Sequence, residues 1–296
     1  MEVDMMAKLT MLNWMASKDF NESLDIQKAW GIEVLDMKDH IFGKSVENLS
    51  YKEAEQAVRL IEARNMSVHC LSTLIFQDDI EKGERQYGGM HLQSVERVLD
   101  IAALFKPTFI RLLPARLPER RQTECSRVCI ERQYPWLYRL YQTAVDQISE
   151  AGYAVTIENE KSSIFSNVDD ILDFFMKLNR SGNVSLTYDV QNLWQMGTFP
   201  SMDVYRNLKP LIGYLHVKGG QAEPGAQELK WKSSLEDASW PVEPMIKQAV
   251  KDNVSPVICL NPTYGQMKEN YDYNNMFKRD LDYMKQIMSR IERCDS

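Results

Sequence analysis

Short apolar runs alternate with longer amphipathic segments along the whole chain. The apolar runs are five or six residues long and rich in β-branched, aromatic and aliphatic side chains, which is typical of buried strands. We expect strands at Leu9–Trp14, Ile32–Met37, Ser67–Leu71, Phe109–Leu113, Ala154–Glu158, Ser185–Asp189, Gly213–Val217 and Pro256–Leu260.

The segments between these strands have helical periodicity. Asp19, with Glu22 three residues later, predicts the N-terminal cap of a first helix that ends at Gly31. Further helices are expected at Tyr51–Arg64, Leu92–Phe105, Trp136–Ala151, Val168–Leu178, Val204–Leu211, Val242–Lys251 and Tyr273–Ile291. Strand and helix therefore alternate eight times, which favours a parallel sheet.

The simplest closed arrangement of such units is a single (β/α)8 TIM barrel over residues 1–296, an α/β fold that typically takes about 250 residues. A doubly wound open sheet is the alternative, but it usually has a glycine-rich turn after its first strand, and Met11–Met15 contains no glycine. Two long connections, at about 115–135 and 219–240, follow strands and should lie on the active face. The first is rich in arginine, either as a solvated surface or as a lid that contacts an anionic substrate or a neighbouring subunit.

Composition narrows the class of protein. The net charge of −7 and the pI of about 5.3 argue against a protein that coats nucleic acid. The five cysteines are odd in number and irregularly spaced, which predicts reduced thiols in a cytoplasmic protein. No signal peptide and no apolar run long enough to cross a membrane is evident. We expect no nucleic-acid or membrane partner, and association into a homo-oligomer is possible.

Four strands in the second half end in polar side chains, and the carboxyl ends of barrel strands meet on one face. These side chains are Glu158, Asp189, His216 with Lys218, and Asn261. Because side chains alternate along a strand, each should point into the barrel mouth. Burying such groups without partners is costly, and a bound cation would offset the cost. Oxygen and nitrogen ligands suit one divalent metal ion, Mn²⁺, Mg²⁺, Co²⁺ or Zn²⁺.

Other strand ends carry further candidates. Lys38, Arg111 and Lys218 could together bind a carboxylate or phosphate of a substrate. Alternatively, Lys38 and Arg111 form salt bridges to Glu158, Glu160 or Asp36 inside the barrel, and the sequence leaves both interpretations open. His69, within the third strand, is either a substrate contact or a core histidine. The remaining candidate substrate contacts are Asn192, Trp14 and Tyr264.

Four segments in order resemble the motif series of the xylose isomerase-like barrel superfamily. They are Ile157-Glu158-Asn159, Asp189-Val190-Gln191-Asn192, Leu215-His216-Val217-Lys218 and Asn261-Pro262. That superfamily includes sugar and sugar-phosphate isomerases, ketose epimerases, inosose dehydratases and endonuclease IV-type enzymes related to family 2 AP endonucleases. The resemblance implies one divalent metal held by Glu158, Asp189, His216 and Asn261. In the isomerases and epimerases, two glutamates that bind the metal also move the substrate proton.

The chain departs from that pattern at two positions. Asn261 stands where the superfamily has the glutamate of strand eight, and Gly219 stands where an aspartate often follows His-x-Lys. An asparagine can bind a hard cation through its carbonyl oxygen, but it cannot act as a general base. We therefore expect Glu158 to remove a substrate proton and either Lys218 or Glu160 to supply the second proton-transfer group.

These observations favour a metal-assisted isomerase or epimerase that acts on a sugar, sugar phosphate or related polyol. A dehydratase of the same superfamily would use the same metal. A non-catalytic sugar-binding barrel with a degenerate metal site is a further alternative, which Asn261 favours. A nuclease of the same superfamily would need more than the four histidines present and is disfavoured by the acidic pI.

Overall fold

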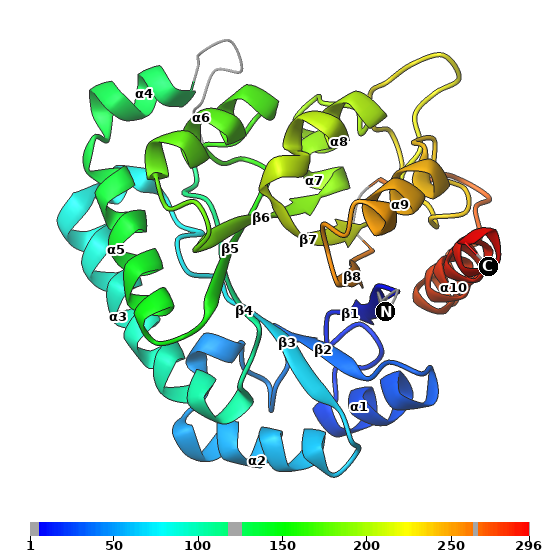
Figure 1. Ribbon diagram of the computed structural model, residues 1–296, viewed down its shortest axis with the longest axis horizontal. Helices are drawn as coiled ribbons and strands as arrows, with labels where there is room; N and C mark the ends of the chain where they lie inside the picture. The colour runs from blue at the N-terminus through cyan, green and yellow to red at the C-terminus, as the bar shows by residue number, and fades with distance from the viewer. Residues whose placement is uncertain (1–5, 118–125, 263–265, 296) are drawn as a thin grey trace.

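Eight parallel strands form the centre of the protein, in the computed structural model that describes residues 6–117, 126–262 and 266–295. The strands are hydrogen-bonded in the order β1-β8-β7-β6-β5-β4-β3-β2. Figure 1 shows them as a ring with the helices outside it. Their bounds are β1 Lys8–Met11, β2 Val34–Met37, β3 Ser67–Ser72, β4 Phe109–Leu112, β5 Ala154–Glu158, β6 Val184–Asp189, β7 Ile212–Val217 and β8 Val257–Leu260. The predicted TIM barrel is confirmed.

The ring is nearly closed, and its seam lies between β1 and β2. There the two segments meet through a single parallel bridge between Leu12 and Asp36, beside a hydrogen bond of 2.9 Å from the Asn13 N–H to the Asp36 carbonyl. On the other side of β2, the register with β3 shifts between Leu35 and Asp36. Such an irregularity redirects the side chain that follows it, and here it occurs at Asp36.

The helices follow the strands as the periodicity predicts. Asp19 accepts a hydrogen bond of 2.8 Å from the Glu22 N–H at the start of the first helix, and Gly31 ends that segment with a φ of 79°. The helix bounds are α1 Phe20–Ala29, α2 Tyr51–Glu62, α3 Gly83–Phe105, α4 Ser126–Gln133, α5 Trp136–Glu150, α6 Val168–Leu178, α7 Val190–Gln195, α8 Met202–Leu208, α9 Val242–Lys251 and α10 Met276–Asp295. Three short 3₁₀ turns are η1 Val46–Asn48, η2 Ile80–Lys82 and η3 Lys209–Leu211. The sequence did not indicate the short α7, and α3 begins nine residues before the predicted Leu92.

Both long connections contain ordered structure. The later part of the connection at 115–135 forms α4, where Arg127 lies 3.4 Å from Asp173 of α6. The connection at 219–240 is fastened to the barrel: the Leu235 N–H donates to Asp280 of α10 at 2.7 Å, and the Trp240 indole donates to the Lys218 carbonyl at 3.0 Å. In the described parts of the chain, no helix is long and apolar enough to cross a membrane.

Candidate active site

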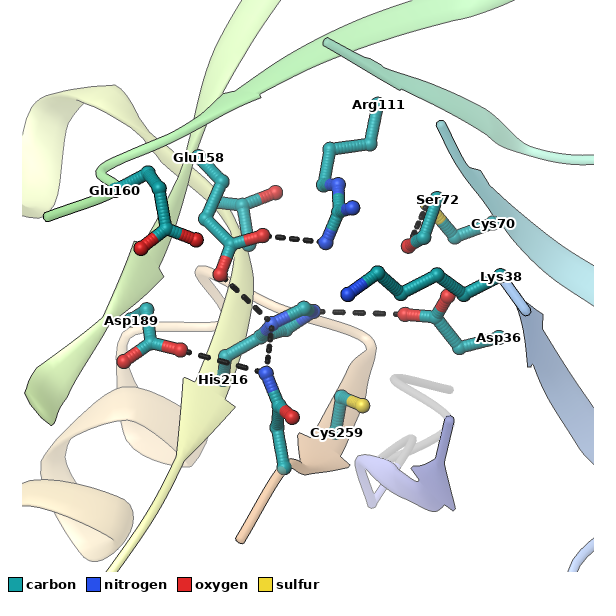
Figure 2. Close-up of polar contacts among 12 residues, drawn as sticks. Asp36, Lys38, Cys70, Ser72, Arg111, Glu158, Glu160, Asp189, His216 and Cys259 are labelled. Atoms are coloured by element: carbon teal, nitrogen blue, oxygen red, sulfur yellow. Dashed lines mark hydrogen bonds and ion pairs between the residues drawn. The ribbon is translucent and has the colours of Figure 1, made fainter. Parts of the chain in front are cut away.

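Three of the predicted metal ligands meet at the carboxyl ends of β5, β6 and β7. Each of Glu158, Asp189 and His216 offers one donor atom, and the three atoms lie within 4.8 Å of one another. Strand register brings them together, since Asp189 pairs with His216 and Glu158 pairs with Thr187 of β6. The Glu158 Oε1 atom lies 3.5 Å from His216 Nδ1 (Figure 2). All three side chains are buried.

Arg111 of β4 forms a buried ion pair with Glu158, which is the salt-bridge alternative that the sequence left open for this arginine. Its second terminal nitrogen donates to the Thr73 carbonyl at 3.1 Å. Burial alone would raise the pKa of Glu158, but the charges of Arg111 and His216 outweigh it and hold this pKa well below its usual range. Glu158 is therefore ionised at neutral pH. Its Oε1 atom also accepts from the Asn192 amide at 3.3 Å.

One oxygen of the Asp189 carboxylate is paired with the Lys218 ammonium, and the other oxygen caps a helix. Its Oδ1 atom accepts from the N–H groups of Gln191 at 3.0 Å and Asn192 at 2.9 Å, so it caps α7. Its Oδ2 atom lies 2.7 Å from Lys218 Nζ. Burial opposes the charge of Lys218, but Asp189 and Glu158 outweigh it and raise the pKa of this lysine. Lys218 also donates to Asn192 at 3.1 Å.

Asn159 fixes the position of Asp189 from the neighbouring strand. Its amide donates to the Asp189 carbonyl at 2.8 Å and accepts from the Asp189 N–H at 2.8 Å. Both hydrogen bonds are buried. Asn159 belongs to one of the sequence motifs, and its side chain acts on the backbone of the next strand rather than in the cavity.

The two departures from the superfamily pattern have clear surroundings. The Asn261 amide nitrogen lies 3.4 Å from His216 Nδ1 and 3.5 Å from Asp189 Oδ2, so this side chain adjoins the three ligands. At Gly219, a Cβ atom would lie 2.0 Å from the Ser233 carbonyl oxygen and 2.5 Å from that of Ser234. The connection at 219–240 thus occupies the space that an aspartate at position 219 would need.

A cavity of about 220 Å³ lies above this cluster. Predicted site residues that line it are Trp14, Lys38, Arg111, Glu158, Glu160, Asn192, Lys218 and Asn261. Gln77 and Lys161 line it as well, and the sequence did not indicate either. Lys38 lies 3.6 Å from Asp39. Burial and the negative charge of Glu158 raise the pKa of Glu160 above its usual range.

Two predicted substrate contacts lie elsewhere. His69 packs edge-on against Phe109 and Tyr214, with ring centroids 5.4 Å and 5.0 Å away, and it does not line the cavity. Burial lowers its pKa to about 4, so this histidine is neutral. Tyr264 lies outside the described residues.

Asp36 is a polar group of the site that the sequence indicated only as a possible salt-bridge partner. It lies on the far side of His216, with 3.5 Å between Asp36 Oδ2 and His216 Nε2, and it accepts from the Tyr214 hydroxyl at 2.9 Å. Burial would raise its pKa, but the hydrogen bond and charge of His216 lower it. The sequence marked this residue only as a lone aspartate within an apolar strand.

The residues present fit a divalent cation. Two carboxylate oxygens and one imidazole nitrogen form an oxygen and nitrogen donor set of the kind that hard and borderline metals prefer. Ligands about 2.0–2.2 Å from one ion lie roughly 3–4.4 Å apart, which is close to the present spacing of at most 4.8 Å. Arg111 does not close the site, since it holds the other Glu158 oxygen from the Oε1 atom that faces His216. Lys218 holds Asp189 Oδ2, so a cation bound to Asp189 would share that oxygen with the lysine.

Solved structures with the same fold include a metal-bound protein, a dehydratase and an epimerase. A xylose isomerase-like TIM barrel protein from Mycobacterium smegmatis, in complex with magnesium, has a TM-score of 0.69 at 15% identity, covering 96% of this chain and 97% of that one. The probable 3-DHS dehydratase AsbF from Bacillus anthracis has a TM-score of 0.69 at 14% identity, covering 94% and 98%. The 3-keto-D-glucoside 4-epimerase YcjR from E. coli has a TM-score of 0.66 at 11% identity, covering 95% and 99%.

At these identities the structures establish the fold alone. No curated protein sequence matches the chain significantly. The sequence profile of the xylose isomerase-like TIM barrel family matches residues 26–287. Because this match spans most of the 296 residues, the protein belongs to the xylose isomerase-like TIM barrel family.

Proposed function

We propose that the protein is a metal-assisted isomerase or epimerase of a small sugar or sugar derivative. The observation that carries the proposal is the convergence of Glu158, Asp189 and His216 beneath a cavity that Glu160 and Lys218 also line. A cavity of about 220 Å³ suits a substrate of a few carbon atoms rather than a polymer. Relatives of the same fold include an epimerase and a dehydratase, which supports this class of chemistry.

Glu158, Asp189 and His216 would hold the cation, and a flip of the Asn261 amide, whose nitrogen now faces His216 and Asp189, would bring its carbonyl oxygen in as a fourth ligand. A divalent cation there would polarise the carbonyl and hydroxyl oxygens of the substrate. Arg111 keeps Glu158 ionised and fixed, which makes it a strong ligand and a weak base. We therefore propose that Glu160 removes the substrate proton, in place of Glu158, which the sequence indicated.

Glu160 lines the cavity, and among the described residues its carboxylate is held by a single hydrogen bond of 2.8 Å, from the Lys161 N–H. It is free to remove the proton from the substrate carbon next to the carbonyl, and its carboxyl oxygen would carry that proton. The Lys218 ammonium lies at the same cavity and would donate a hydrogen bond to the oxygen on which negative charge develops. Transfer of that proton from Glu160 to the former carbonyl carbon, with the adjacent hydroxyl proton passing to the former carbonyl oxygen, would give an isomer. An epimer would require that Lys218 donate a proton to the opposite face of the first carbon, while Glu160 keeps the proton that it removed.

Proton exchange tests this proposal without knowledge of the substrate. The protein would be incubated in D₂O with a panel of ketoses and ketose phosphates, with Mg²⁺, Mn²⁺, Co²⁺ or Zn²⁺, and the ¹H NMR signal next to the carbonyl would be followed. We expect metal-dependent loss of this signal for at least one compound, and at least a 100-fold slower loss in Glu160→Gln. Asp203→Asn, which changes a side chain 83% exposed on α8, should exchange as the original chain does.

A dehydratase is the second candidate, and Asn261 favours it. An elimination needs one group to remove the proton and an acid to assist the departing hydroxyl, so Glu160 and Lys218 suffice without a second glutamate. In the same experiment, signals of an unsaturated product would identify this reaction. Binding of sugars with no exchange under any metal would refute both reactions and favour a non-catalytic sugar-binding barrel.

A further inference from the structure

A carboxylate stands behind the candidate metal ligand His216, on the side away from the cavity. Asp36 Oδ2 lies 3.5 Å from His216 Nε2, whereas Nδ1 of the same ring lies 3.5 Å from Glu158 Oε1 (Figure 2). Asp36 and His216 are both 0% exposed. The two nitrogens of one ring therefore have different partners, one toward the predicted cation and one toward the interior.

The carboxylate is itself fixed. The Tyr214 hydroxyl donates to the same Asp36 oxygen at 2.9 Å. The Tyr214 ring packs edge-on against the His216 ring at 4.7 Å between centroids. The register of β2 shifts after Leu35, and Asp36 meets these two residues across the barrel interior, since they come from β7, which is separated from β2 by β1 and β8. A strand irregularity and two long-range contacts thus hold one side chain behind His216.

We propose that Asp36 is a positioning residue that accepts the Nε2–H of His216 and leaves the Nδ1 lone pair for the metal. The inference rests on the proposed metal site. An imidazole that binds a cation gives up its positive charge and keeps one N–H, so a hydrogen-bond acceptor at one nitrogen decides which nitrogen binds the cation. It also fixes the plane of the ring, and outer partners of this kind typically change metal affinity by about 10-fold to 100-fold.

A different use of Asp36 is a second metal site, because Asp36, His216 and Cys259 also offer donor atoms within 4.8 Å of one another. Two contacts and the burial of these side chains favour the positioning role. Tyr214 already donates to the Asp36 oxygen nearest His216. The Cys259 thiol donates to the Leu260 carbonyl at 3.7 Å. All three side chains of this group are 0% exposed, so a cation would have to pass the first site to reach it.

The test combines metal affinity with a spectrum of the histidine. Zn²⁺ affinity would be measured by competition with a chelator for the original chain, Asp36→Asn and Tyr214→Phe. We expect Asp36→Asn to lose about 10-fold to 100-fold in affinity, because its amide can donate to Nε2 and so favour a proton on Nδ1. Asp203→Asn, measured beside them, makes the same change at a side chain 83% exposed on α8 and serves as the matched control, with a change below about threefold. Tyr214→Phe keeps the carboxylate but removes the hydroxyl that fixes it, so its loss should lie between those of Asp203→Asn and Asp36→Asn.

The ¹⁵N NMR spectrum of the Zn²⁺-loaded original chain needs no variant. We expect a proton on Nε2 of His216 and the shift of a metal-bound nitrogen at Nδ1. Zn²⁺ on Nε2, or an affinity that Asp36→Asn leaves unchanged, would overturn the positioning role while leaving the proposed reaction intact. A thiolate-to-metal absorption of the Co²⁺-loaded protein that Cys259→Ser removes would also overturn it. Metal binding that depends on Asp36, without proton exchange on any sugar, would instead refute the proposed function alone.

Discussion

Replacing Arg111 with methionine separates the charge of this side chain from its volume. Methionine fills much of the space of the arginine stem and removes the guanidinium group. Arg111 and Glu158 are 2% and 3% exposed, so Glu158 would lose its partner without gaining water. Removing one member of a buried ion pair costs about 3–5 kcal/mol, and the lost hydrogen bond to Thr73 adds about 1 kcal/mol. We expect the free energy of unfolding to fall by roughly 4–6 kcal/mol at pH 7.

Urea denaturation of Arg111→Met, Glu158→Gln and the double variant would measure this loss and its cause. The double variant should be more stable than Arg111→Met alone, because it removes the unpaired carboxylate. A saturating divalent cation should stabilise Arg111→Met more than the original chain, since Glu158 would then regain a positive partner.

The pH dependence gives an independent check. The pKa of Glu158 is lowered in the folded state, so its charge stabilises the protein above the unfolded pKa of about 4.3. This stabilisation is lost as the pH falls through the folded pKa. The free energy of unfolding of Arg111→Met should therefore fall less far below that of the original chain at acidic pH than at pH 7. A loss below about 1 kcal/mol at pH 7, with additive effects in the double variant, would refute the reasoning.

Three further changes test other contacts. Asp280 is buried with a pKa raised to about 7, so its ionisation costs stability as the pH rises from about 4 through 7. Asp280→Asn should remove on the order of 3 kcal/mol of the loss between pH 5 and pH 8, measured by thermal unfolding at these two values. Gly219→Ala should destabilise by about 1–3 kcal/mol in urea, because its Cβ would lie 2.0 Å from the Ser233 carbonyl; an unchanged midpoint would show that the connection yields. Asn159→Leu leaves the buried N–H and C=O of Asp189 without their partners, so the free energy of unfolding should fall by about 2–4 kcal/mol. Zn²⁺ binding should also weaken in a chelator competition, and intact binding would mean that Asp189 is placed by other contacts.

The barrel and the grouping of its candidate ligands could be predicted because they follow local rules. A parallel barrel puts the carboxyl ends of its strands on one face, so Glu158, Asp189 and His216 could be grouped from their places at strand ends alone. Strand alternation then gave their direction. The ion pair of Arg111 with Glu158 could be proposed only as one of two alternatives, because the choice depends on the distance between side chains on adjacent strands.

Contacts that cross the barrel could not be predicted in the same way. Asp36 reaches His216 because the register of β2 shifts beside it, and no local pattern marks that shift. For His69 the sequence left a substrate contact and a core histidine open, and its packing against the rings of Phe109 and Tyr214 agrees with the core histidine. The proposed roles of Glu158 as ligand and Glu160 as base also depend on which carboxylate adjoins Arg111, and the two glutamates lie only two residues apart in the chain.

The seam of the barrel has a consequence for how the protein responds to heat. The backbone of Asp36 bridges the seam to Leu12 and Asn13, while its side chain faces His216. Separation of β1 from β2 would therefore displace Asp36 before the remaining strand pairs come apart. Thermal inactivation should then begin as local breathing at the junction of the first two strands, with release of bound metal at temperatures below the global melting transition. Hydrogen exchange at the amide of Asn13, faster than that of the amides between β5 and β6, would mark this weak point.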